Sequence, residues 1–241
     1  MQVIGVDSAV QEKDNGLVLC NYHDNKLELV DKWERNGTVT TKILSWIGNA
    51  EQTLIAIDSP LGWPFEFTNS LATHKAGVPI EIGANDFFKR QTDLQIATEF
   101  NKRPLEVSAD RIARTAFYTL DRIGKLRRET SRSIKLLWKF GEDFDIGFIE
   151  VYPASTILAN GLSITGYKKE QSLRHNLLDE LQKEYRLNNP NTIDVFKIEH
   201  DFDALVCCFS GVDFIEKRSI QYDSLSERIQ KEGWIWARKA K

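Results

Sequence analysis

Acidic residues stand where several apolar segments of this chain end. Asp7 closes the segment 2–7, Asp58 closes 54–58, and Glu150 stands near the end of 146–151. In an open α/β sheet, ligands bind outside the carboxyl ends of the strands, so we expect these carboxylates to line one crevice. Carboxylate oxygens are the ligands that hard cations such as Mg²⁺ or Mn²⁺ prefer. The sequence therefore predicts an acidic metal pocket.

A further acidic group opens an apolar helix late in the chain, in the stretch His200-Asp-Phe-Asp203. Asp203 is the expected ligand and Asp201 the alternative. Carboxylates in the first turn of a helix are favoured by unpaired amides and the helix dipole whatever the function, so one of the two can be a cap. His200 is placed to shuttle a proton or orient a leaving group, or it has a structural role.

The other carboxylates have structural alternatives as well. Asp7 can cap a turn, Asp58 before Ser-Pro can begin an Asx turn, and Glu150 can pair with a cation of the basic segment. Four carboxylates crowded together without cations would repel one another. Two divalent ions about 3.5–4 Å apart relieve that repulsion and can also activate water for phosphodiester hydrolysis. We therefore expect Asp7, Asp58, Glu150 and Asp203 to hold two Mg²⁺ or Mn²⁺ ions, with Glu150 as fourth ligand or base.

Positive charge is concentrated between residues 111 and 139, where nine Lys or Arg face only Asp121 and Glu129. Such a run usually forms a solvated helix face, but it can also bind the phosphate backbone of a nucleic acid. Arg111 and Arg114 share one face of the helix that should begin after residue 108, and we expect them to bind nucleic acid. Arg90, in an irregular stretch, is a candidate phosphate clamp.

The elements that must position these residues follow from hydrophobic periodicity and turn signals. Strands are expected at 2–7, 17–22, 26–33, 54–58 and 146–151, with a short one at 192–196. Helices are expected at 39–48, after 108, at 168–187 and from 201 onwards. Residues 59–107 contain too many Pro and Gly for long elements, so we expect an insertion with short helices that covers the site. The whole is predicted to be a single α/β domain.

This order of elements resembles the ribonuclease-H-like fold, a mixed five-stranded sheet flanked by helices. Six segments resemble the family known as domain of unknown function 429, whose members are predicted nucleases; they are 5–9, 56–64, 90–93, 150–154, 200–204 and 232–234. The stretch His200-x-x-Asp203-Ala204 is similar to the H-x-x-D-A element of Holliday-junction resolvases and of the matching nuclease domain of CRISPR effectors. These resemblances imply metal-ligand roles for Asp7, Asp58 and Asp203. Glu150 belongs to the family motif and departs from the resolvase pattern.

Composition sets the remaining limits. A length of 241 residues suits one large domain, and the net charge of -3 gives no global sign of nucleic-acid binding. Three cysteines without ligand spacing predict a reducing compartment, and we expect a cytoplasmic location. No apolar run approaches the length of about 18 residues that a membrane span requires.

The sequence therefore predicts a metal-dependent nuclease acting on DNA or RNA. One alternative is an ATP-dependent kinase or ATPase of the sugar-kinase and actin-like type. That class needs glycine-rich phosphate loops, and Asp7-Ser8-Ala9 lacks the glycine expected near the first strand. The other alternative is a non-catalytic module that binds nucleic acid or a protein partner.

Overall fold

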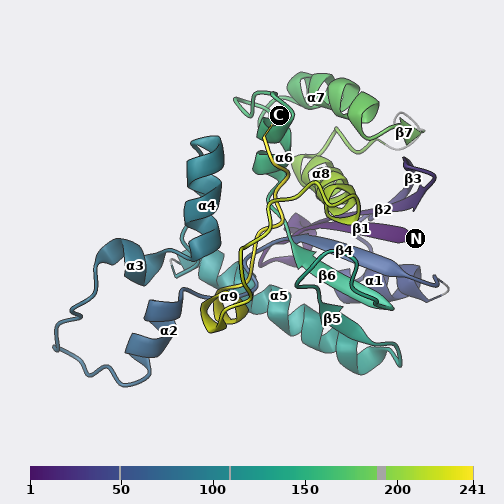
Figure 1. Ribbon diagram of the computed structural model, residues 1–241. Helices are drawn as coiled ribbons and strands as arrows, with labels where there is room; N and C mark the ends of the chain where they lie inside the picture. Colours follow the sequence, from purple (N-terminus) through teal and green to yellow (C-terminus); the bar gives the residue numbers. More distant parts are fainter. Residues whose placement is uncertain (49, 109, 189–193, 241) are drawn as a thin grey trace.

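A computed structural model describes residues 1–48, 50–108, 110–188 and 194–240 of the chain. Within these ranges seven strands form one mixed sheet in the order β5-β6-β4-β1-β2-β3-β7 (Figure 1). Strand β2 runs antiparallel to its neighbours β1 and β3, and the other paired strands are parallel. The strands are β1 (Gln2–Asp7), β2 (Gly16–His23), β3 (Lys26–Lys32), β4 (Thr53–Asp58), β5 (Ile134–Leu136), β6 (Ile146–Glu150) and β7 (Leu187–Asn188).

The central order β3-β2-β1-β4-β6, with β2 reversed, is the ribonuclease-H-like arrangement, so the predicted fold class is confirmed. The five longer strands that the sequence predicted form this core of the sheet. Two short edge strands, β5 and β7, extend it to seven among the described residues. Of the short strand expected at 192–196, residues 192 and 193 lie outside the described residues, and 194–196 do not form a strand.

Helices cover both faces of the sheet (Figure 1). Helices α1 (Val39–Ile47) and α5 (Asp110–Glu129) pack on one face, while α6 (Pro153–Ala159), α7 (Gln171–Glu184) and α8 (Glu199–Ile215) pack on the other. Because side chains alternate along a strand, Ile4 and Val6 contact the α1 and α5 layer, whereas Val3 contacts the α8 layer. Asp7 is therefore on the side of β1 that faces α8.

Helix α8 lies unusually close to the sheet because glycines face it. A Cβ atom on Gly5 would lie 1.8 Å from the backbone oxygen of Ala204, and one on Gly16 would lie 1.8 Å from that of His200. These approaches are possible only without a side chain. The helix is buried from Asp201 to Phe214, as its apolar sequence predicts. Its first turn consequently sits against the carboxyl end of β1 and the start of β2.

Residues 59–107 connect β4 to α5 and contain α2 (Phe65–Leu71), α3 (Ala84–Phe88) and α4 (Gln91–Phe100). This segment extends away from the sheet, and the late helix α9 (Glu227–Glu232) contacts its helices α2 and α4 (Figure 1). A short 3-10 helix, η1 (Glu12–Asp14), lies between β1 and β2.

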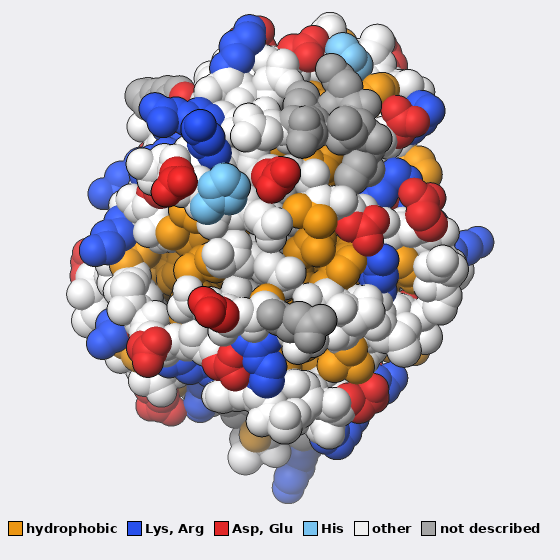
Figure 2. Space-filling view, turned by 90° about the vertical axis from the view of Figure 1, so that its right-hand side faces the viewer, with side chains coloured by type: hydrophobic (Ala, Val, Ile, Leu, Met, Phe, Trp, Pro, Cys, Tyr) orange, Lys and Arg blue, Asp and Glu red, His pale blue; other side chains and the backbone are white. Residues whose placement is uncertain are grey.

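Among the described residues, no helix combines the length and the apolar character needed to span a membrane. The face of the molecule that carries the β3 and β7 edge has acidic and basic side chains interspersed (Figure 2). That face therefore offers no extended surface of one sign.

Candidate active site

Asp7 and Asp58 are neighbours at the carboxyl end of the sheet. They are the last residues of β1 and β4, and the parallel register pairs them directly. Gly5 of β1 and Ala56 of β4 also pair, and both face the α8 side of the sheet. Because every second residue of a strand points to the same face, both aspartates point toward α8. The structure thus brings these two predicted ligands together.

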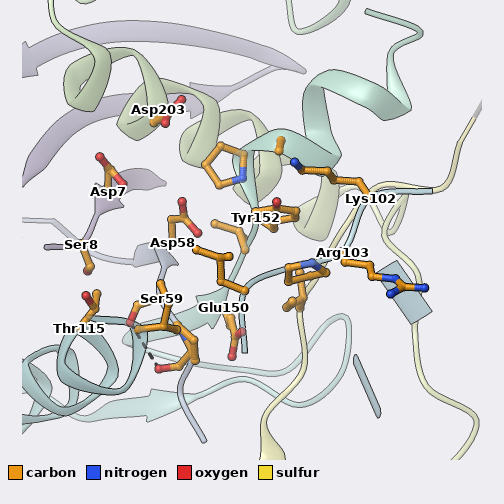
Figure 3. A pocket seen from close by; sticks show the side chains of 18 of the residues that line it. Asp7, Ser8, Asp58, Ser59, Lys102, Arg103, Thr115, Glu150, Tyr152 and Asp203 are labelled. Carbon is orange, nitrogen blue, oxygen red and sulfur yellow. Dashed lines mark hydrogen bonds between the residues drawn. The ribbon is translucent and has the colours of Figure 1, made fainter. Parts of the chain in front are cut away.

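Asp203 and His200 reach the same place from the N-terminal end of α8. The Nδ1 atom of His200 lies 2.6 Å from Oδ2 of Asp7, within hydrogen-bond distance. Asp7, Asp58 and Asp203 line one cavity of about 540 Å³. Figure 3 shows the three aspartates around a common space, with Asp203 coming from the helix above the strands. Three of the five predicted catalytic residues therefore meet here, and His200 joins them through its contact with Asp7.

Asp201 lies on a different side of α8 and binds cations of β3 and the following loop. Its side chain is 0% exposed, with Oδ1 2.7 Å from Nη2 of Arg35 and Oδ2 3.7 Å from Nζ of Lys32. Of the two acids in the first turn, Asp203 faces the cavity, whereas Asp201 ties α8 to the end of the sheet.

The pocket carboxylates have raised pKa values. Burial raises the pKa of Asp58 well above its usual range, and the charges of Asp7 and Asp203 raise it further. Burial also raises the pKa of Asp7, against the hydrogen bond from His200, and it raises the pKa of Asp203 to about 6, against the charge of Lys168. The same hydrogen bond to Asp7 raises the pKa of His200. Additional positive charge would therefore be favourable in this pocket.

Glu150 is not grouped with the three aspartates. Its register partner on β4 is Ile57, not Asp58, so its side chain points to the opposite face of the sheet. There its two oxygens accept hydrogen bonds of 2.8 and 2.9 Å from Arg90, and the backbone N–H of Leu61 donates to Oε2 at 2.9 Å. The expected salt-bridge alternative for Glu150 is thus present, with Arg90 as partner in place of the basic segment.

Arg90 itself is 1% exposed and also binds Asp93 through Nε and Nη2. Both Arg90 and Glu150 border the cavity, yet each is engaged with the other. The guanidinium is therefore held inside a buried ion network and does not project freely toward a phosphate.

Arg111 and Arg114 lie exposed on the first turns of α5. Arg114 makes only a loose contact of 3.9 Å with Asp110. Their neighbours Ile112 and Thr115 line the cavity, whereas the two arginines do not.

Two lysines of the cavity had no signal in the sequence. Lys168, in the loop between α6 and α7, places Nζ 3.1 Å from Oδ2 of Asp203 and 2.9 Å from Oε1 of Glu199. Lys102 lines the cavity, forms no ion pair with a described residue, and extends over the pocket in Figure 3. Lys102 stands in an irregular segment. Lys168 lies ahead of α7, which begins at Gln171 and not at residue 168 as the sequence predicted, so only tertiary packing decides what either side chain contacts.

The donor set suits a hard divalent cation. The pocket offers carboxylate oxygens, and the buried Oδ1 of Asp203 has no hydrogen-bond partner among the described residues. As the side chains stand, no group of three or more His, Cys, Asp or Glu in the described ranges is arranged to hold a metal ion. One oxygen of Asp203 is bound by Lys168 and one of Asp7 by His200. The pocket therefore suits a divalent ion in the type of its ligand atoms and not in their present arrangement.

The topology and the pocket define an α/β protein of the ribonuclease-H-like class with an acidic cavity at the strand ends. The chain belongs to the family described as "Protein of unknown function (DUF429)", whose model matches residues 5–220. Among solved structures it is similar to T. thermophilus RuvC in complex with Holliday junction substrate, at 12% identity and a TM-score of 0.42. That match covers 88% of this chain and 94% of the other. No curated protein matches the chain.

Proposed function

We propose that this protein is a metal-dependent nuclease that hydrolyses phosphodiester bonds of DNA or RNA. The observation that carries the proposal is the meeting of Asp7, Asp58 and Asp203, from β1, β4 and α8, in one cavity. Three adjacent carboxylates with raised pKa values destabilise one another unless a cation joins them.

These three aspartates would hold Mg²⁺ or Mn²⁺. Bound divalent ions lower the pKa of water and stabilise charge on the departing oxygen of a phosphodiester. The chain's own contribution is to fix the carboxylates in place: the register of β1 and β4 sets two of them, and the close approach of α8 sets the third.

His200 holds Asp7 in position and can carry a proton. Nδ1 faces Oδ2 of Asp7 at 2.6 Å, and the side chain is 35% exposed, so the ring remains open to solvent. A histidine with one nitrogen fixed by a carboxylate keeps the other available for proton transfer. We assign His200 the roles of orienting Asp7 and of moving a proton near the leaving group.

The border of the cavity suits a polyanion. Lys102 and Arg103 line it without ion-pair partners among the described residues, and Arg111 and Arg114 stand nearby on α5. Exposed cations beside an acidic metal pocket would attract the phosphate backbone and fix its path. The exposed Leu105 and the ring of Tyr152 add apolar surface that could contact sugars or bases.

Arg90 and Glu150 have a positioning role in this proposal. Their ion pair fastens the segment that follows β4 to the end of β6, with Leu61 bound to the same carboxylate. Lys102 to Leu105 of the same insertion border the cavity. We propose that residues 59–107 cover the site and that this buried pair keeps them in place.

Asp203→Asn and Asp201→Asn form a matched test of the assignment. Both replace a buried acid of the same helical turn, but only Asp203 faces the cavity. With labelled DNA and RNA and Mn²⁺, we expect Asp203→Asn to lower cleavage about a hundredfold or more, with little change for Asp201→Asn.

Circular dichroism would verify that both variants are folded. Equal cleavage by wild type and Asp203→Asn would refute the proposed site. Tight nucleic-acid binding without turnover in any metal would instead identify a non-catalytic binding module.

A further inference from the structure

Lys168 is held beside Asp203 by a loop whose backbone is firmly anchored. Tyr167 is 2% exposed, and its ring packs on Phe202 of α8 at a centroid distance of 5.9 Å. The buried guanidinium of Arg174 donates to the backbone oxygens of Tyr167 and Lys168, at 2.7 and 3.3 Å. The position of Lys168 is therefore a property of the folded loop and not of a free surface side chain.

The ammonium group of Lys168 joins two carboxylates of the first turn of α8. It lies 2.9 Å from Glu199 and 3.1 Å from Asp203, which is 1% exposed and cannot turn to solvent. Burial lowers the pKa of Lys168, but the charges of Asp203 and Glu199 outweigh it and leave the pKa raised. Lys168 also lowers the pKa values of Asp7 and Asp58, so its field reaches all three pocket acids.

Asp203 and Asp7 each have one carboxylate oxygen in contact with a side chain, Lys168 for Asp203 and His200 for Asp7. The Asp58 carboxylate accepts no hydrogen bond from a described residue. A divalent ion on Asp203 would lie close to the ammonium, and like charges repel strongly in a partly buried site. Asp7 and Asp58 make no contact with Lys168, so an ion between them is subject to less of that repulsion.

We propose that Lys168 takes the place of one of the two divalent ions, so that the pocket binds a single ion tightly, chiefly through Asp7 and Asp58. The inference rests on the metal site of the proposed function and replaces the expected pair of ions by one ion and one ammonium group. Since the side chain is 57% exposed, Lys168 can also meet a phosphate oxygen without leaving Asp203.

Counting bound ions tests the inference without reference to activity. Mn²⁺ would be titrated into the protein and the unbound ion measured by electron paramagnetic resonance. We expect one tightly bound Mn²⁺ in the wild type. Lys168→Met should bind a second Mn²⁺, at least about tenfold more tightly than the wild type does.

Two variants serve as controls. Lys168→Arg keeps the positive charge and should bind one ion. Lys169→Met removes the adjacent exposed cation, which forms no ion pair with a described residue, and should also bind one ion.

Two equally tight ions in the wild type would overturn the inference, and that measurement does not depend on any variant folding. Unchanged binding by a folded Lys168→Met protein would overturn it as well, as would the absence of Mn²⁺ binding. Cleavage of nucleic acid that Asp203→Asn abolishes would leave the proposed nuclease function intact in each of these cases.

Discussion

Two groups of acids lie at or near the cavity and differ in how their charge is balanced. The anchor acids are Asp93, Glu150 and Glu232, and the pocket acids are Asp7, Asp58 and Asp203. Arg90 binds both Asp93 and Glu150. Glu232 accepts hydrogen bonds from the backbone N–H groups of Phe65 and Gln91 and from Arg228.

The pocket acids have fewer partners. The Asp58 carboxylate receives no hydrogen bond from a described residue, and Oδ1 of Asp203 is buried without a partner among them. Buried polar groups of a folded protein are normally satisfied, so an exception calls for a functional reason. The contrast distinguishes the anchor acids, which hold segments of the fold together, from the pocket acids, which the proposed function assigns to a metal ion.

The largest expected effect on stability comes from removing Arg90, the cation that binds two of the anchor acids. Arg90→Met leaves Asp93 and Glu150 buried without their common partner, and we expect the free energy of unfolding to fall by about 3–5 kcal/mol. Urea denaturation measures the change. Arg103→Met, an exposed cation of the same insertion, is the control and should change stability by less than about 0.5 kcal/mol. Equal effects of the two substitutions on stability would show that the anchor acids do not depend on Arg90.

Asp213 shows how burial alone changes the pKa of an acid that does have a cation as partner. It is 0% exposed and bound by Arg218, yet burial raises its pKa from 3.8 to about 6. A raised carboxyl pKa stabilises the folded protein fully below the unfolded value and loses that contribution as pH rises through the folded value.

We therefore expect the stability of the wild type relative to Asp213→Asn to fall by about 3 kcal/mol between about pH 4 and about pH 7. Urea denaturation of both proteins at each pH measures the difference. A difference independent of pH would show that the paired arginine offsets burial completely.

Asp58→Asn should stabilise the metal-free protein by about 1–2 kcal/mol at neutral pH, because it removes a partly buried carboxylate that accepts no hydrogen bond from a described residue and is repelled by Asp7 and Asp203. Glu150→Gln is the matched change in the anchor acids and should act in the opposite direction, since it weakens the bonds to Arg90. Differential scanning calorimetry without divalent ions measures both. Destabilisation by both substitutions would contradict the comparison.

The smallest effect is expected within the first turn of α8. Asp201→Asn keeps one acceptor for Arg35 but loses the charge, and we expect a loss of about 1 kcal/mol of unfolding free energy. Thermal unfolding compares it with Asp203→Asn, which should not destabilise the metal-free protein, because Lys168 is largely solvated. A greater loss for Asp203→Asn would place that residue with the anchor acids.

The sequence predicted the position of an acid correctly where the acid stands in a strand or helix with clear hydrophobic periodicity. Asp7 and Asp58 end regular strands, and Asp203 opens an apolar helix, so their positions follow from the periodicity of those elements. Parallel pairing of β1 and β4 then brings the strand ends together.

The prediction of a metal role for Glu150 depended on more than periodicity. A strand end specifies the edge of the sheet, but the face depends on register, and here Glu150 pairs with Ile57 instead of Asp58. The partners of Arg90 and Lys168 could not be predicted from the sequence either, since both residues stand outside regular helices and strands. Their contacts arise only when the insertion and the loop before α7 pack on the core.

The close approach of α8 to β1 has a consequence for how the protein is made. Asp7 and Asp58 come from the first quarter of the chain, but Asp203 comes from a helix that ends at Ile215. A nascent chain emerging from the ribosome therefore has two of the three carboxylates long before the third can dock against Gly5. The acidic pocket can therefore form only after α8 has been synthesised and has docked on the sheet.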